Sequence, residues 1–137
     1  MKKKLIISII ICFTALSSCK KYIQQQEQNA LVNLITNGSW EITRYVENGT
    51  DITSSFSGYS FQFLTNGTVT GTNGGTTADG TWAGDINTKT ITSNFPSAGN
   101  PLDKLNAVWK ITDSYSDSVA AKATIDSGTN ILNMHKK

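Results

Sequence analysis

The sequence predicts a mainly β protein: an antiparallel up-and-down β-barrel of about eight strands, with a short N-terminal helix. Two observations lead to this fold class. After Gly38 the chain is rich in Thr, Ser, Asn and Gly, and short runs alternate apolar with polar residues, as half-buried strands do. Tight turn signals such as Asn-Gly separate these runs, which favours successive hairpins. Closing such a meander into a barrel leaves no exposed edge strand.

The first 18 residues have the features of a secretory signal peptide. Three lysines at residues 2–4 precede an apolar run over residues 5–16. This run is shorter than the ~20 apolar residues that a membrane-spanning helix needs, and small residues follow it, as they do before a cleavage site. The ending Leu16-Ser17-Ser18-Cys19 resembles the lipobox of bacterial lipoproteins. The resemblance implies cleavage before Cys19 and acylation of its sulfur and new amino group. The alternative is an ordinary signal peptide followed by an incidental cysteine.

Cleavage changes the charge and the cysteine content of the chain. Removing 18 of the 137 residues takes away three of the 12 basic residues and none of the 10 acidic ones, so the formal charge falls from +2 to −1. The basic cluster that remains near the anchor is Lys20-Lys21. Two lysines are too few for nucleic-acid binding, because such binding needs several neutralised phosphates. Cys12 leaves with the signal and Cys19 is expected to be acylated, so we expect no disulfide.

The chain is therefore expected to divide into a signal peptide over residues 1–18, a tether over 19–30 and one barrel domain over 31–137. The segment after Cys19 is polar, Gln-rich and without periodicity, which predicts that it buries nothing. A short amphipathic helix is expected from Gln25 to Thr36, ended by Asn37-Gly38. Its apolar residues recur at helical spacing: Leu31, Leu34 and Ile35.

The first strands of the barrel follow directly. One is expected from Ser39 to Glu47, ending at Asn48-Gly49, and the next from Tyr59 to Leu64. Asn66-Gly67 then predicts a hairpin with a type I′ turn, in which both central residues have positive φ. The extended pattern resumes at Thr68-Val69-Thr70.

The middle of the chain contains further turn signals. Gly74-Gly75 and Asp79-Gly80 predict the next two reversals, with a short strand at Thr81-Trp82-Ala83 after the second. A strand is expected from Thr88 to Ser93. The run from Pro101 to Leu105 interrupts the alternation and predicts a single helical turn.

Three strands complete the predicted barrel, at Ala107 to Thr112, Ser118 to Ile125 and Asn130 to His135. The second of them alternates most regularly. Short strands at such regular spacing are typical of a sandwich or a barrel, and the two-residue hairpins favour the barrel.

The order of these motifs resembles a known family. A short helix followed by Gly38-Ser39-Trp40 is similar to the start of lipocalins, and the motifs that follow resemble the lipocalin-like domains of lipoproteins in the Bacteroidota. Those motifs are Phe61-Gln62-Phe63, Asn66-Gly67-Thr68-Val69, Gly80-Thr81-Trp82 and Trp109-Lys110-Ile111. The resemblance runs from Leu31 to the C-terminus and implies an outer-membrane lipoprotein.

The resemblance also implies how the barrel is closed at one end. The first-strand tryptophan, here Trp40, closes the narrow end in lipocalins, and an arginine on the last strand stacks over it. This chain offers His135, Lys136 or Lys137 for that role. The domain is also shorter than typical lipocalins, and an eight-stranded barrel has room either for its own side chains or for one small ligand.

Aromatic residues are the candidates for a binding site. They line a pocket for an apolar ligand or fill the barrel as core, and the set is Tyr59, Phe61, Phe63, Trp82 and Trp109. Arg44 is a further candidate, because strict alternation places it on the same face as Trp40 and Ile42. A buried lone charge is costly, so either a bulge turns Arg44 away or it faces a polar ligand.

Catalytic and metal-binding patterns are missing from the sequence. His135 is the single histidine and stands near the C-terminus, and no Gly-x-Ser-x-Gly, Walker or His-Glu-x-x-His motif occurs. One histidine without thiolates does not make a usual zinc site. Asp113 and Asp117 do not fit the EF-hand spacing, because Ser118 occupies the position that requires glycine. We therefore expect a protein that is not an enzyme and holds no metal or cofactor.

Two functions remain as expectations. The first is a monomeric, membrane-tethered binding module for a small apolar ligand, anchored through Cys19 at the outer membrane. The alternative is a structural or interaction lipoprotein whose filled barrel presents its loops to a protein or glycan partner. A cavity of several hundred Å³ favours the first function, and a packed lumen favours the second.

Overall fold

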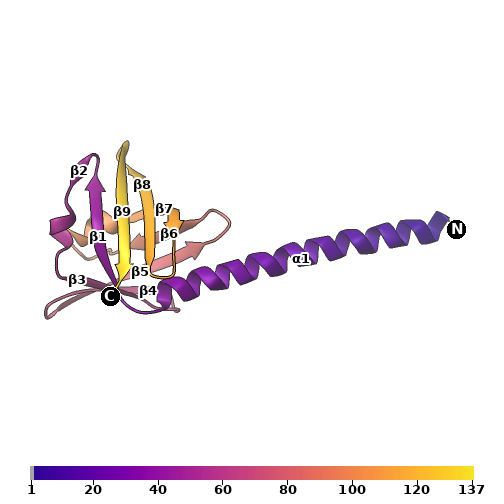
Figure 1. Ribbon diagram of the computed structural model, residues 1–137, viewed down its shortest axis with the longest axis horizontal. Helices are drawn as coiled ribbons and strands as arrows, with labels where there is room; N and C mark the ends of the chain where they lie inside the picture. Colours follow the sequence, from indigo (N-terminus) through magenta and orange to yellow (C-terminus); the bar gives the residue numbers. More distant parts are fainter. Residues whose placement is uncertain (1) are drawn as a thin grey trace.

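The computed structural model describes the backbone of residues 2–137 and the side chains of residues 19–137. One helix, α1 (Lys2–Thr36), precedes the strands and projects from one end of the barrel (Figure 1). The strands are β1 (Trp40–Glu47), β2 (Thr50–Asp51), β3 (Tyr59–Phe63), β4 (Thr68–Asn73), β5 (Thr76–Asp85), β6 (Thr90–Asn94), β7 (Ala107–Ser114), β8 (Ser118–Ile125) and β9 (Gly128–Lys136). Two short 3₁₀ turns, η1 (Thr53–Phe56) and η2 (Leu102–Leu105), lie in the longer connections.

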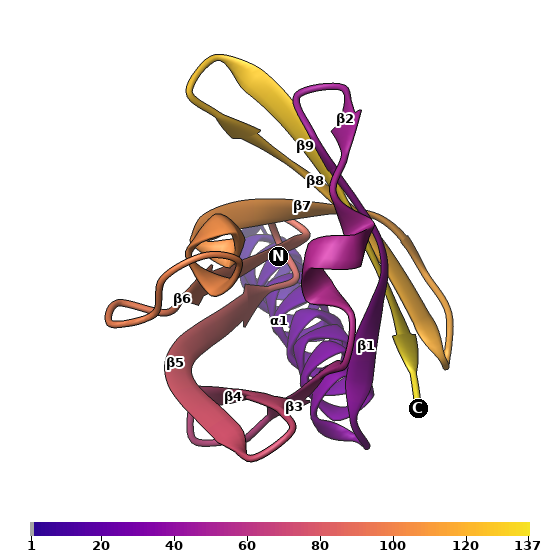
Figure 2. The ribbon, with the colours of Figure 1, turned by 90° about the vertical axis from the view of Figure 1, so that its left-hand side faces the viewer.

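Eight of these strands form a closed antiparallel barrel, which confirms the predicted fold class. Each strand from β3 to β8 pairs with the next along the chain, and β1 pairs with β9 on one side and with β3 on the other. Figure 2 shows the strands as a ring with α1 behind it. The additional strand β2 pairs only with the end of β1. The helical turn expected at Pro101 to Leu105 is confirmed as η2.

A bulge in β1 decides which of its side chains enter the barrel. The pairing with β9 shifts register between Ile42 and Arg44. As a result Ile42 and Tyr45 are buried, whereas Arg44 is exposed on the outer wall. The bulge is therefore the correct alternative of the two that the sequence left open, and an inward-facing Arg44 is wrong.

The reversal expected at Asp79-Gly80 is also wrong, because β5 runs without interruption through both residues and Gly80 pairs with Val69 of β4. The glycine serves close packing instead of a turn. A Cβ atom on Gly80 would lie next to the carbonyl oxygen of Asn94 and 2.9 Å from the ring of Phe95. Glycine inside a strand is typical of such a close approach.

Asn-Gly pairs make two different turns in this chain. Asn48 and Gly49 both have positive φ, of 45° and 86°, as a type I′ turn requires. At the β3–β4 hairpin only Gly67 of the pair has positive φ, and its N–H donates to the carbonyl of Leu64 over 3.1 Å. The hairpin is confirmed, but its turn is of type I with a glycine in the left-handed region and not of type I′.

The two 3₁₀ turns cover the end of the barrel opposite to α1. Phe56 of η1 stacks on Tyr45, with ring centroids 5.0 Å apart. In η2, Leu102 and Leu105 are buried, and the carbonyl of Lys104 accepts a hydrogen bond of 2.6 Å from the Tyr45 hydroxyl. The cover is therefore fixed to β1 by apolar packing and by a partly buried hydrogen bond.

The helix α1 begins earlier than the expected start at Gln25 and includes the predicted tether. Residues 19–27 are exposed, as the lack of periodicity predicted, but Lys, Gln and Glu are good helix formers and no Gly or Pro interrupts them. Docking starts at Gln28, whose side-chain amide donates to the carbonyl of Gly84 (2.8 Å) and accepts from the N–H of Ile86 (2.9 Å). Leu31 and Ile35 are then buried against the barrel. Within the described part of the chain, no helix is long and apolar enough to cross a membrane.

Candidate ligand site in the barrel lumen

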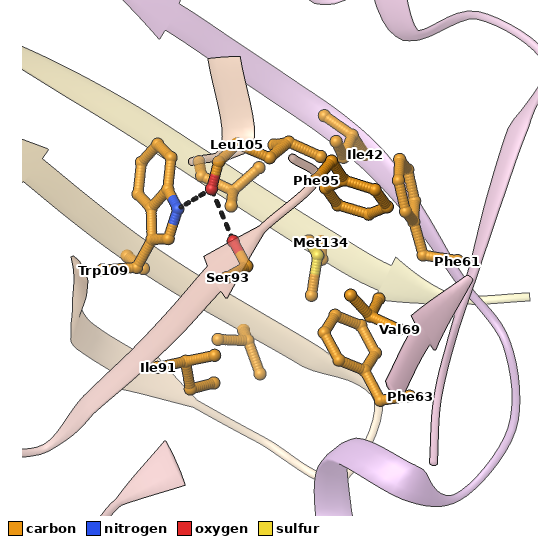
Figure 3. Close-up of a pocket in the computed structure, with 13 residues that line it drawn as sticks. Ile42, Phe61, Phe63, Val69, Ile91, Ser93, Phe95, Leu105, Trp109 and Met134 are labelled. Atoms are coloured by element: carbon orange, nitrogen blue, oxygen red, sulfur yellow. Dashed lines mark hydrogen bonds between the residues drawn. The ribbon is translucent and has the colours of Figure 1, made fainter. Parts of the chain in front are cut away.

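The centre of the barrel contains a small apolar cavity. Its volume is about 40 Å³, and side chains from the strands, from η2 and from the connection that precedes η2 line it (Figure 3). The lining residues labelled in Figure 3 are Ile42, Phe61, Phe63, Val69, Ile91, Ser93, Phe95, Leu105, Trp109 and Met134. Alternation directs the strand residues among them inward, because successive residues of a strand point to opposite faces.

The polar atoms around the cavity bind one another. Ser93 Oγ and Trp109 Nε1 both donate to the carbonyl oxygen of Leu105, the latter over 3.0 Å (Figure 3). Among the side chains that the structure describes, every buried nitrogen and oxygen atom has a hydrogen-bond partner. None of the described side chains therefore directs an unsatisfied donor or acceptor into the lumen to orient a ligand.

Three of the five aromatic candidates meet at the cavity. Phe61, Phe63 and Trp109 line it. Trp82 is buried beside it, with its ring edge-on to Phe63 at 5.6 Å and its Nε1 donating to the carbonyl of Leu64. Tyr59, the first residue of β3, is half-buried and stacks on Phe61 with ring centroids 5.9 Å apart. The five aromatic candidates therefore serve mainly as packed core side chains.

Sequence reasoning missed three residues of this region. Phe95 and Leu105 lie outside the alternating runs that marked the strands, so their inward direction follows only from the folded connection between β6 and β7. Strict alternation from Trp40 and Ile42 puts Tyr45 on the outer face, whereas the bulge turns it inward. Burial raises the pKa of Tyr45 to about 12, although a hydrogen bond from Asn130 opposes the shift.

The end of the barrel next to α1 is closed around Trp40. Its side chain is 0% exposed, and Nε1 donates to the carbonyl of Ile35 over 2.9 Å. Of the three cations that the sequence offered, Lys136 takes the place over the ring, with Nζ 5.3 Å from the centroid. His135 is instead exposed, with Nε2 3.5 Å from Asp117 Oδ2. The described residues contain no group of three or more His, Cys, Asp or Glu arranged to hold a metal ion.

The size of the cavity decides what the lumen can hold. Pockets for drug-sized ligands measure about 300–1,000 Å³, whereas a void of about 40 Å³ accommodates a few atoms at most. An apolar void of this kind stays dry. The lumen is therefore filled by the chain's own side chains.

Comparisons with known proteins support the fold. No protein-family model matches the sequence, and no curated protein matches it. The structure is similar to the crystal structure of a DUF4847 family protein from Bacteroides vulgatus ATCC 8482, with a TM-score of 0.58 and 15% identity. The likeness covers 78% of this chain and 97% of the other. At this identity it shows that the two proteins share a barrel fold, which is consistent with the lipocalin-like fold that the sequence motifs implied.

Proposed function

We propose that this protein is a lipid-anchored, non-enzymatic interaction module of the outer membrane, whose filled barrel presents its outer wall and loops to a protein or glycan partner. The observation that carries the proposal is the lumen, which holds a void of about 40 Å³ and, among the side chains that the structure describes, no buried polar atom without a partner. The alternative, a small apolar ligand inside the barrel, requires a cavity of several hundred Å³. In the closed structure the lumen has no such space.

The polar side chains on the outer wall of the barrel favour a polar partner. Along β4 and β5 short polar side chains face each other in register, with Thr70 Oγ1 donating to Asp79 Oδ1 over 3.1 Å and Thr72 Oγ1 3.4 Å from Thr77 Oγ1. Hydroxyl groups both donate and accept hydrogen bonds. Such a surface matches the hydroxyl groups of a glycan or the polar rim of a protein interface.

The position of Cys19 supports the anchor. The residue is exposed on α1, nine residues before the helix docks at Gln28. At about 1.5 Å per residue this separation is ~14 Å. Acyl chains on its sulfur and amino group would therefore lie clear of the barrel, and two or more chains give stable membrane attachment where one is marginal.

The proposal is tested by expressing the full chain and a Cys19→Ser variant in a Bacteroidota host. Wild type is expected in the membrane fraction with acyl groups added to its mass, and Cys19→Ser in the soluble fraction. Cys12→Ser is the matched control, since this residue lies in the predicted signal, and it should stay anchored. Retention of Cys19→Ser in washed membranes, with no acyl mass on wild type, would refute the anchor.

Native mass spectrometry of the same purified protein tests the lumen. We expect the mass of the modified chain with no additional small molecule. An apolar compound that co-purifies in a one-to-one ratio would refute the filled barrel and favour the ligand-binding alternative.

A further inference from the structure

Exposed apolar side chains occur on the projecting part of α1 and at the end of the barrel to which α1 is attached. Tyr22 and Ile23, on α1 itself, are 64% and 54% exposed. Leu64 and Tyr115 are also exposed and lie in the β3–β4 and β7–β8 turns. The antiparallel order of the strands places both turns at the end of the barrel where β1 begins and α1 is attached. Val108, at the start of β7, is the exposed apolar residue that lies toward the opposite end.

The charges on this part of α1 have one sign. Lys20 and Lys21 are exposed, and no acidic residue occurs between Cys19 and Glu27. A helix turns by about 100° per residue, because 3.6 residues make one turn. The side chains of residues 20–23 are therefore distributed around the whole circumference of the helix and do not form one face. A groove on a partner protein would cover one face, whereas a lipid layer surrounds a helix that enters it end-on.

We propose that residues 20–23 form a second membrane contact, with an affinity of their own for anionic lipid headgroups. Lys20 and Lys21 pair with the headgroup phosphates, and Tyr22 and Ile23 follow them towards the barrel and pack among the headgroups. Tyrosine is enriched at the level of the headgroups because its ring is apolar and its hydroxyl is polar. The location of the contact rests on the proposed anchor at Cys19, which is the preceding residue.

The length of the exposed part of α1, residues 19–27, agrees with this placement. Residues 20–23 span ~6 Å of helix, about the depth of the polar layer on one side of a bilayer, which is roughly 5–8 Å. Gln28, where α1 first contacts the barrel, lies ~14 Å from Cys19 along the helix. The barrel would then stand just outside the headgroups, with the turns that carry Leu64 and Tyr115 on its membrane-facing end.

The contact is tested on the chain from residue 19 to 137 with Cys19→Ala, which carries no acyl group. The contacts between α1 and the barrel begin at Gln28, so this chain retains its fold; far-UV circular dichroism checks this. Binding is measured by co-sedimentation with vesicles of phosphatidylcholine, with or without one-third phosphatidylglycerol. We expect binding to the anionic vesicles that decreases as salt is added.

Substitutions at the contact identify its residues. Lys20→Gln with Lys21→Gln should lower the partition coefficient on anionic vesicles about 30-fold, which corresponds to ~1 kcal/mol per lysine. Tyr22→Ser with Ile23→Ser should also weaken binding, whereas Val108→Ser, at an equally exposed apolar residue, should not.

Three results would overturn the proposal: no binding at millimolar anionic lipid, equal binding to neutral vesicles, or binding that the lysine substitutions leave unchanged. Because the tested chain has no acyl group, each result is independent of whether Cys19 is lipidated in the cell. A failed anchor would therefore be recognised separately, by the mass of the full-length protein.

Discussion

Trp40 offers the sharpest test of how the helix and the barrel are joined. The side chain is fully buried, its Nε1 donates to the carbonyl of Ile35 in the last turn of α1, and Lys136 lies over its ring. The last carbonyls of a helix have no partner within the helix. The indole therefore satisfies one of them while it closes the barrel, so a single residue couples the two elements.

Three substitutions separate these contributions. Trp40→Ala removes the whole side chain, and deleting a buried aromatic costs about 3–5 kcal/mol of unfolding free energy. Trp40→Phe keeps an aromatic ring but leaves the Ile35 carbonyl without its donor, which costs about 1–3 kcal/mol. Lys136→Gln removes only the cation over the ring, for which we expect ~0.5–1 kcal/mol. The expected order of destabilisation is thus Trp40→Ala, Trp40→Phe, Lys136→Gln.

Urea denaturation followed by far-UV circular dichroism measures all three, since tryptophan emission changes with the substitution itself. Hydrogen exchange adds a local measurement: Trp40→Phe should speed exchange in residues 31–36, where α1 docks. If Trp40→Ala is too unstable to purify, the phenylalanine variant still decides the question. A loss below ~1 kcal/mol for Trp40→Ala would refute the reasoning, because such a value is typical of surface substitutions.

Two further predictions concern the interior of the barrel. Gly80→Ala should lower the free energy of unfolding, measured by urea denaturation, by ~1–3 kcal/mol or more, because its Cβ would meet the backbone oxygen of Asn94. The control is Gly75→Ala, which should be nearly neutral because no atom lies within 4 Å of the added Cβ. Because the pKa of Tyr45 is raised from 10 to about 12 in the folded protein, its contribution to stability is complete below pH 10 and is lost as the pH rises toward 12. Denaturation at pH 9 to 12 should show this loss, roughly 2–3 kcal/mol at about 1.4 kcal/mol per pKa unit, and the loss should be absent in Tyr45→Phe.

Local patterns were sufficient to predict most of the fold. Strands such as β3 and β8 follow from period-two alternation, because each has one face in the core and one in solvent. Hairpins followed from Asn-Gly and Gly-Gly pairs, whose backbone freedom matches tight turns. The errors have physical causes that a local pattern does not contain. Gly80 is required by the approach of Asn94 from another strand and not by a turn.

The candidate site was predicted less completely than the fold. The inward aromatic residues of β3 were identified because alternation places them there. The inward position of Tyr45 depends on the bulge in β1, which the cost of burying Arg44 suggested without fixing its location. The residues that fill the remaining space, Phe95 and Leu105, come from the connection between β6 and β7. No periodicity records how such a connection folds over the end of a barrel.

The filled lumen follows from the way in which this barrel is stabilised. A domain of this size without a disulfide depends on apolar burial, and each large side chain buried contributes roughly 1.5–3 kcal/mol. Phe56, Leu102 and Leu105 close one end of the barrel, and Trp40 closes the other. Opening either end to a ligand would expose these side chains to water and break the hydrogen bonds that Tyr45 and Trp109 donate to η2. The packed core thus leaves the outer wall, the turns and the exposed part of α1 as the surfaces available for binding, which is why the proposed partners lie outside the barrel.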